Sequence, residues 1–334
     1  MNRINSLTGL KIISLLGIFY WHSNLPKNNI DFGARLCEIF FVVSGFLVAL
    51  NFNTKNTDYS FKNMVSYFKR KLKNMYPLHI ITFLICVFFI KKFDLIIVLF
   101  NLLLIQSWAS DINIYLGYNE VSWFLSSILF CYFFAPFFAH HFKKSSLKQN
   151  AIILFGLIIF RVFLDGLPYL TQYKLWDINV HVNPFVRLFE FLIGMLTFHF
   201  FNSAKNSKNL ENKNCNYLIT AWEIFYFISL ALIWKYTSFI RAFYIPLIAI
   251  LIFTMALEKG YISKLLSSKI FLFLGSFEFE FFMFHQLIIK LFSIYLPENR
   301  LTPNLYLYNT IILFVAILTA YIYKNLYLKI KKEN

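Results

Sequence analysis

Long apolar stretches alternate with short polar breaks along the whole chain. Eleven stretches can be distinguished, at residues 10–21, 36–50, 78–90, 95–107, 123–139, 151–164, 184–201, 217–234, 243–257, 270–291 and 305–323. Most approach the roughly 20 residues that a helix needs to cross a hydrocarbon core of about 30 Å. Lipid cannot satisfy backbone hydrogen bonds, so each spanning stretch should be helical. The pattern predicts an all-α polytopic membrane protein.

Lysine and arginine residues in the polar breaks predict how the helices are oriented. The basic breaks lie at residues 55–73, 143–148, 205–213, 259–269 and 329–332. Such loops usually face the cytoplasm. The acidic or neutral breaks should then lie outside, at residues 110–120, 165–182 and 297–303. Both termini are therefore predicted to be cytoplasmic, which requires an even number of crossings.

Eleven apolar stretches conflict with an even number of crossings, so one stretch should not cross the membrane. The region between residues 73 and 111 is where we place this stretch. Two short apolar runs in this region are separated by Lys91, Lys92 and Asp94. We predict one net crossing plus a re-entrant or interfacial piece, which is tolerated where protein covers the backbone. The expected architecture is a bundle of about ten transmembrane helices with a re-entrant segment. It should form a single integral membrane domain over residues 1–334.

The composition supports a membrane protein. Hydrophobic residues make up 59% of the 334 residues and charged residues only 14%, whereas soluble domains carry about a quarter charged residues. The net charge of +16 does not indicate nucleic-acid binding, because the basic residues fall in short loops between apolar runs. The four cysteines lack metal-ligand spacing, so no metal is expected. No cleavage site precedes His22, so the first stretch should be an uncleaved helix.

Ionisable side chains lie within the predicted spans, where each costs about 2.5 to 3.5 kcal/mol on insertion scales. Among them are Lys11 and His22, which bracket the first span, Glu38, which opens the second, Arg187 with Glu190, and His285, which ends a run that contains Glu278 and Glu280. A helix would place Lys11 and His22 about 16 Å apart along its axis. Any one of them could be structural: Arg187 and Glu190, three residues apart, could pair to stabilise packing. Together they favour a polar cavity inside the bundle.

Two blocks near the N-terminus resemble a known family. Lys11 and His22, with ten residues between them, resemble the Arg-x10-His signature of the acyltransferase 3 family. Lysine replaces the usual arginine, which keeps the charge but loses the bidentate fork. Residues 38–47, with the sequence Glu-Ile-Phe-Phe-Val-Val-Ser-Gly-Phe-Leu, resemble the family's acidic-aliphatic-Phe-Phe-x-x-Ser-Gly-Phe block.

Later blocks extend the resemblance to residue 285. Residues 68–77 are similar to the family's basic loop that ends in Arg-Ile-Tyr-Pro, although Asn74 replaces the last arginine. Residues 123–126 resemble its Trp-x-Leu segment, but Ile128 stands where many members have Glu, so a role of that acid does not carry over. Residues 184–194 resemble its Arg-x-x-Glu-Phe-x-x-Gly segment. Residues 275–285 resemble its late Ser-to-His helix.

The resemblance implies a membrane-bound O-acyltransferase. Such an enzyme would move an acyl group, usually acetyl, from cytoplasmic acyl-coenzyme A to a hydroxyl of a cell-surface or lipid-linked glycan. The transfer needs a base for the hydroxyl proton, a cationic place for the donor's phosphates and stabilisation of the developing oxyanion. We expect His22 to be the base or a transient acyl carrier, Glu38 to orient its ring, and Lys11 to complete the catalytic group.

The donor and the acceptor each have an expected site. The expected donor site, for the phosphates of acetyl-coenzyme A, consists of Arg70, Lys71, Lys73 and Tyr76. The same charges could instead serve only to fix the topology. The residues expected to line the substrate cavity are Ser44, Trp123, Arg187, Glu190 and His285.

A transporter or flippase for a surface-glycan precursor is the main alternative, because charges at membrane depth also mark substrate pathways. No inverted repeat or pair of broken helices supports it. A purely structural membrane protein would not require so many ionisable residues in its spans. We expect the inner membrane of the cell as the location, with lipid, acyl-coenzyme A and a glycan as partners. The acceptor glycan and the oligomeric state stay open.

Overall fold

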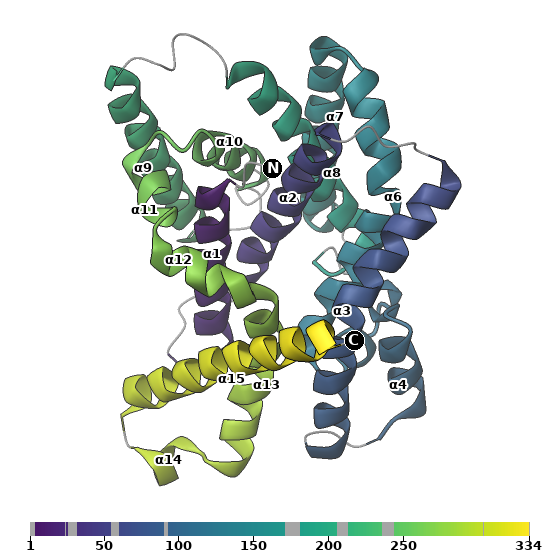
Figure 1. Ribbon diagram of the computed structural model, residues 1–334, viewed down its shortest axis with the longest axis vertical. Coiled ribbons are helices and arrows are strands. Elements are labelled where there is room, and N and C mark those ends of the chain that lie inside the picture. Colours follow the sequence, from purple (N-terminus) through teal and green to yellow (C-terminus); the bar gives the residue numbers. More distant parts are fainter. Residues whose placement is uncertain are drawn as a thin grey trace.

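The computed structural model describes residues 4–23, 25, 32–54, 60–89, 93–170, 181–205, 213–235, 244–302 and 304–333. These residues form helices, turns and short connections, and no strand occurs among them. Figure 1 shows the arrangement of the helices. The prediction of an all-α protein is confirmed. The predicted outer loop at 165–182 lies largely outside the described residues.

Ten helices of 13 or more residues account for most of the structure. They are α1 (Asn5–His22), α2 (Phe32–Asn53), α3 (Phe61–Phe89), α6 (Trp123–Lys144), α7 (Leu147–Leu170), α8 (Pro184–Ala204), α9 (Lys213–Lys235), α10 (Tyr244–Ala256), α13 (Glu278–Tyr295) and α15 (Leu305–Glu333). Shorter elements connect them, namely α4 (Leu95–Leu102), η1 (Gln106–Trp108), α5 (Ile112–Tyr115), η2 (Glu120–Ser122), α11 (Tyr261–Leu266), α12 (Lys269–Leu274), η5 (Gly275–Phe277) and α14 (Glu298–Leu301).

Seven segments of the described chain are long and apolar enough to cross a membrane. They are Arg35–Asn53, Phe61–Phe89, Glu120–Lys144, Leu147–Leu164, Pro184–Ala204, Lys269–Tyr295 and Leu305–Lys331. The protein is therefore a multi-pass membrane protein, as predicted. Helices α1, α9 and α10 would complete the predicted ten crossings, and that number stays a prediction.

The region between residues 73 and 111 contains one long helix and one short helix. Helix α3 runs through Pro77 for 29 residues, which is about 43 Å. Helix α4 has eight residues, about 12 Å, and is too short to cross. The Asp94 carboxylate begins it by accepting the backbone N–H groups of Ile96 and Ile97. One crossing plus a short piece agrees with the sequence-based prediction.

The basic stretch before residue 73 is mostly helical, although the sequence analysis treated it as a loop. Helix α3 begins at Phe61. Tyr67, Phe68, Leu72 and Met75 pack against the two hydrophobic clusters of the bundle. This apolar side explains why the helix continues past its basic residues.

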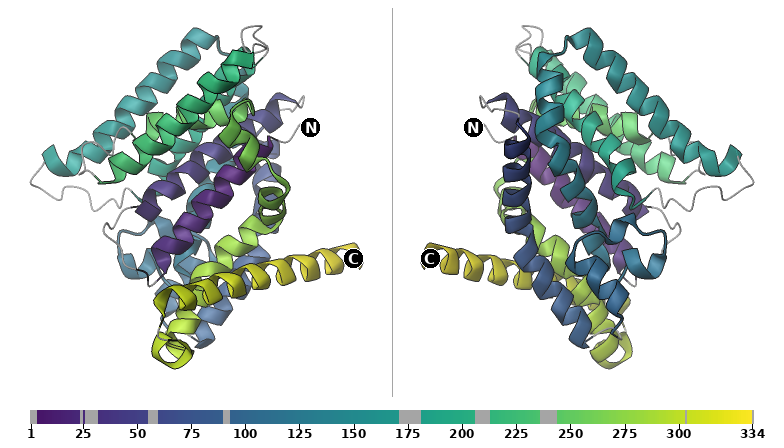
Figure 2. Two further views of the ribbon diagram at one scale, coloured as in Figure 1. Left: turned by 90° about the vertical axis from the view of Figure 1, so that its left-hand side faces the viewer. Right: turned by 90° about the vertical axis from the view of Figure 1, so that its right-hand side faces the viewer.

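Glycines bring α2 and α8 into direct backbone contact. A Cβ atom added to Gly45 would overlap the carbonyl oxygen of Phe191, and one added to Gly194 would overlap the carbonyl oxygen of Val42. Small residues allow such close approach between membrane helices. Contacts also join α1 to α2 and α13, and α13 to α15. Helix α15 lies across one end of the bundle, and its C-terminus projects beyond the neighbouring helices (Figure 2).

Candidate active site

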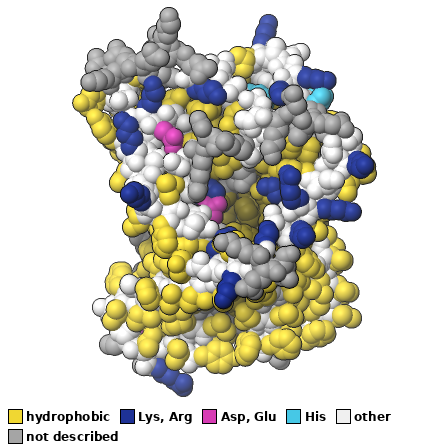
Figure 3. Space-filling model, viewed as in Figure 1, with side chains coloured by type: hydrophobic (Ala, Val, Ile, Leu, Met, Phe, Trp, Pro, Cys, Tyr) yellow, Lys and Arg dark blue, Asp and Glu magenta, His cyan; other side chains and the backbone are white. Residues whose placement is uncertain are grey.

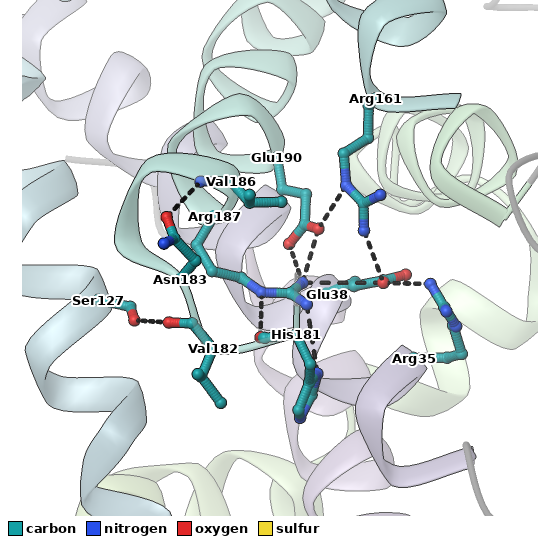
Figure 4. A network of polar contacts seen from close by, with 10 residues as sticks. All are labelled: Arg35, Glu38, Ser127, Arg161, His181, Val182, Asn183, Val186, Arg187 and Glu190. Atoms are coloured by element: carbon teal, nitrogen blue, oxygen red, sulfur yellow. Dashed lines mark hydrogen bonds and ion pairs between the residues drawn. The ribbon is translucent and has the colours of Figure 1, made fainter. Parts of the chain in front are cut away.

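A buried cluster of charged residues joins α2, α7 and α8 (Figure 4). Arg187 Nη1 donates to both carboxylate oxygens of Glu190, at 2.6 and 2.5 Å. Arg161 of α7 lies between two helices: its Nε is 3.2 Å from Glu190 Oε1, and its Nη2 is 3.4 Å from Glu38 Oε1. Arg35 Nη1 donates to the same Glu38 oxygen at 2.5 Å. Three arginines thus share two carboxylates.

The segment before α8 holds Arg187 in place. Its Nε donates to the carbonyl oxygen of His181 at 2.6 Å, and its Nη2 lies 3.2 Å from His181 Nδ1. Asn183 caps α8 by accepting the backbone N–H of Phe185. Burial, together with the positive charges of Arg187 and its neighbours, holds the pKa of His181 well below its ordinary value. The imidazole is therefore neutral and accepts from the arginine.

Aromatic rings cover one side of this cluster. The Trp123 ring lies 4.7 Å from that of His181 and 6.3 Å from that of Phe41, measured between centroids. The guanidinium carbon of Arg187 is 5.6 Å from the centroid of the Phe41 ring. The predicted cavity residues Trp123, Arg187 and Glu190 therefore lie together, and Glu38 lies with them.

A second polar group surrounds the end of α1. The imidazole rings of His22 and His285 lie 5.3 Å apart, measured between centroids. Gln286 Nε2 is 3.2 Å from His22 Nδ1 and donates to Glu120 Oε2 at 2.5 Å. Lys290 pairs with the other oxygen of the Glu120 carboxylate. The His285 Nδ1 lies 2.7 Å from the carbonyl oxygen of Phe282, which fixes the direction of its ring.

Lys11 lies 11 residues before His22, in the N-terminal half of α1. Its ammonium group pairs with the carboxylate of Glu278 at the start of α13. The next acidic side chain of α13, Glu280, pairs with Lys324 of α15 at 2.8 Å. On an ideal helix, Lys11 and His22 are about 16 Å apart. The two residues of the N-terminal motif therefore take part in separate polar groups.

The expected donor-site residues lie along α3. Lys71 Nζ is 4.2 Å from the centroid of the Tyr132 ring, and the Arg70 guanidinium carbon is 5.2 Å from that of Tyr67. The Ser44 side chain lies beside that of Tyr132. Figure 3 shows lysine and arginine side chains around a hollow on the face between α12 and α3. These contacts bring Ser44 to the donor-side group rather than to the Arg187 cluster.

Lys73 and Tyr76 complete the expected donor set. Lys73 is exposed. The Tyr76 hydroxyl donates to the carbonyl oxygen of Leu102 at 3.0 Å, and His79 Nε2 bonds to the carbonyl oxygen of Asn101 at 2.9 Å. Tyr76 therefore attaches the short α4 segment to α3.

The acyltransferase domain model matches residues 4–324 of the chain. The chain belongs to the acyltransferase 3 family. This membership confirms the resemblance read from the N-terminal motifs.

Two curated proteins are similar to this acyltransferase 3 chain. Acyltransferase MdmB of Streptomyces mycarofaciens is 25% identical over 228 residues, which cover 58% of this chain and 56% of that protein. "Putative O-acetyltransferase SACOL0978" of Staphylococcus aureus (strain COL) is 23% identical, with 92% of this chain and 54% of that protein covered. The chain thus matches little more than half the length of either relative. No solved structure matches it.

The acyltransferase 3 motifs have different structural roles in this chain. Glu38, Arg187 and Glu190 form the buried charged cluster, and Gly45 and Gly194 allow α2 and α8 to approach closely enough to form it. The contacts of Glu38 are made to arginines. The group at Nδ1 of His22 is Gln286. The expectation that Glu38 orients His22 is therefore not supported by these contacts.

Several residues of this family member's site were missed by the sequence analysis. Arg161 lies inside the apolar stretch 151–164, so the rule that marks ionisable residues in spans applies to it too. Arg35 lies one residue before such a stretch. Glu120 and Gln286 are 166 positions apart, and no local pattern predicts their contact. No group of three or more metal-binding side chains occurs in the part of the chain that the structure describes.

Proposed function

We propose that this chain is a membrane O-acyltransferase. It moves an acyl group, acetyl by preference, from acyl-coenzyme A to a hydroxyl of a cell-surface or lipid-linked glycan. The observation that carries the proposal is the pair of imidazoles, His22 and His285, 5.3 Å apart and surrounded by polar partners within an apolar bundle. Imidazole is the side chain best suited to proton transfer near neutral pH.

The proposed reaction is a direct exchange at the acyl carbon. The glycan hydroxyl oxygen forms a bond to the thioester carbonyl carbon, and the carbon–sulfur bond breaks. The hydroxyl proton passes to an imidazole and then to the leaving thiolate, so protons and charge balance. The sequence motif gives His22 the role of base or acyl carrier.

We assign the donor to the cytoplasmic side. Arg70, Lys71 and Lys73 on α3 supply positive charge for the donor's phosphates. In the proposed orientation Lys11, which pairs with Glu278, lies closer to the cytoplasm than His22 does. This orientation puts both termini in the cytoplasm, within the inner membrane, because the basic breaks lie on that side.

We assign the acceptor to the opposite side of the bundle. Trp123 and the Arg187–Glu190 pair are buried, and in this proposal they form the inner wall of the acceptor site. Glu38 and Arg161 keep that pair in a fixed position. In this proposal residues 1–334 act as one acyltransferase unit in contact with lipid, acyl donor and glycan.

The test uses acetyl-coenzyme A labelled in its acetyl group. Purified protein is reconstituted in vesicles that also contain envelope extract as the source of acceptor. An enzyme will release free coenzyme A and leave the label covalently attached to a glycan fraction. A transporter or flippase will move a glycan precursor across the vesicle membrane without consuming the thioester, and that result would contradict the proposal.

A further inference from the structure

Glu120 fixes the orientation of a neighbouring amide. Gln286 Nε2 lies 2.5 Å from Glu120 Oε2, and Lys290 pairs with Oε1 of the same carboxylate. An ionised carboxylate only accepts hydrogen bonds. The amide atom that faces it must therefore be the NH2 group of Gln286, and the amide oxygen points away.

The amide in turn fixes the tautomer of His22. The same Nε2 atom of Gln286 lies 3.2 Å from His22 Nδ1. An amide NH2 group only donates, so His22 Nδ1 accepts with its lone pair. The hydrogen bond at one ring nitrogen decides which nitrogen carries the proton. The neutral His22 ring therefore carries its proton on Nε2.

His285 has the opposite tautomer. Its Nδ1 lies 2.7 Å from the carbonyl oxygen of Phe282, and a carbonyl only accepts. Nδ1 therefore carries the proton, and the lone pair is on Nε2. That Nε2 atom is buried and has no hydrogen-bond partner among the described residues. The two rings thus have opposite tautomers: Nε2 of His22 carries a proton, and Nε2 of His285 carries a lone pair.

We infer that Glu120 and Gln286 are positioning residues that hold His22 as the Nε2–H tautomer, and that His285 Nε2 is the proton acceptor of the reaction. This inference rests on the proposed acyl transfer. The hydroxyl proton moves to His285 Nε2 as the carbon–oxygen bond forms. His22 Nε2–H donates to the carbonyl oxygen while negative charge develops there. When the carbon–sulfur bond breaks, the proton on His285 passes to the sulfur.

Protonation of His22 is opposed by the same contacts. An imidazolium has an N–H at both nitrogens, and the one at Nδ1 would point at the NH2 group that Glu120 holds in place. The described charged or titratable groups that contact His22 or its Gln286 partner are His285 of α13, whose ring lies beside that of His22, and Glu120 of η2, which in turn pairs with Lys290. Among these, Glu120 acts on His22 through the Gln286 amide.

Nitrogen NMR of the full chain in nanodiscs, with 15N-labelled histidine, tests the tautomers directly. Ring nitrogens with a proton and with a lone pair have well-separated shifts, and His22→Gln and His285→Gln variants assign the signals. We expect His22 with a proton on Nε2 and His285 with a proton on Nδ1. A proton on Nδ1 of His22 would overturn the inference. Because no acyl donor is needed, this result is independent of whether the protein transfers acetyl groups.

Exchanging the two partners separates positioning from stability. The double variant Glu120→Gln with Gln286→Glu keeps one carboxylate and one amide, but a carboxylate now faces His22 Nδ1 and draws the proton there. We expect the inverted tautomer and a loss of glycan acetylation in cells of about 10²- to 10⁴-fold, since a catalytic imidazole in the wrong tautomer loses about that much rate. Normal acetylation with an inverted tautomer would overturn the assignment.

A matched control lies on the same helix. Glu280→Gln removes another carboxylate of α13, one that pairs with Lys324 at 2.8 Å and has no part in the His22 contacts. We expect the control to keep its acetylation and the wild-type ring shifts. Equal losses of acetylation in the control and in the Glu120→Gln, Gln286→Glu double variant would mean that any changed carboxylate of this region has the same effect, and would overturn the positioning role.

Discussion

Glu38 of α2 and Glu190 of α8 share the guanidinium group of Arg161, which comes from a third helix. All three side chains are almost fully buried. Two carboxylates this close would repel each other without the arginines between them. Arg161 therefore provides a polar link from α7 to both α2 and α8, in an otherwise apolar part of that helix.

Replacing Arg161 with alanine should strongly destabilise the protein. Removing one partner of a buried ion pair leaves uncompensated charge and costs about 3 to 5 kcal/mol. Thermal unfolding of the purified protein in detergent measures the loss. Lys148→Ala on the same helix, at an exposed position, should change the unfolding temperature very little. Equal stability of the two variants would contradict the role given to Arg161.

The close backbone contact between α2 and α8 predicts how an added methyl group at Gly45 or Gly194 changes the stability of the protein. Gly45→Ala and Gly194→Ala should each lower stability and accumulation in the membrane, because the new Cβ atoms would overlap the facing backbone. Gly156 is a suitable control, because a Cβ there meets nothing within 4 Å. Gly156→Ala should be neutral or raise stability by up to about 1 kcal/mol. If all three variants behave alike, helix propensity rather than packing determines the result.

The basic residues of α3 predict a change in donor affinity. The double variant Arg70→Ala with Lys71→Ala should raise the KM for acetyl-coenzyme A about 10- to 100-fold, since hydrogen bonds to charged groups contribute about 1.5 to 3 kcal/mol. Lys143→Ala with Lys144→Ala removes the same charge from another basic segment of the chain. A similar rise in both double variants would mean that the charges act only on topology or general attraction.

The environment of His181 predicts that the stability of the folded protein depends on pH. The folded-state pKa of this histidine lies well below the ordinary value, because burial and nearby arginines oppose its protonation. The unfolded chain therefore binds a proton that the folded protein does not, so stability is lost as pH falls below about 6.5. Unfolding temperatures recorded from pH 8 down to pH 5 measure this loss of stability. The range extends about 1.5 pH units on either side of the ordinary histidine pKa of about 6.5. His181→Asn should show a shallower decline, and an unchanged decline would contradict the assignment.

The sequence predicts the helical fold well because lipid leaves few alternatives. Apolar length alone predicts α6 and α8 within about five residues, whereas the predicted stretch 270–291 is divided in the structure into α12, η5 and α13. It misplaces the beginning of α3, since a helix with one apolar side can extend from the membrane into a basic segment. The spacing of three residues also correctly indicates that Arg187 and Glu190 form a pair.

The sequence predicts only part of the candidate site, and the reason is physical. Lys11 and His22 are linked by spacing along one helix, and so are Arg187 and Glu190. Contacts between distant helices depend on their rotation and depth, which no local pattern encodes. Glu38 therefore pairs with Arg161, and Gln286 occupies the Nδ1 side of His22. The expected role of Glu38 toward His22 stays a prediction.

The central claim is acyl transfer at His22, and one variant tests it most directly. Cells that lack the gene are complemented with the wild type, with His22→Ala or with His141→Ala, a variant of an exposed histidine of α6. Mass spectra of the surface glycans then report the acyl increment, with protein abundance measured in parallel. We predict a normal increment for the wild type and His141→Ala, and none for His22→Ala at equal abundance. A near-normal increment in His22→Ala would contradict the account.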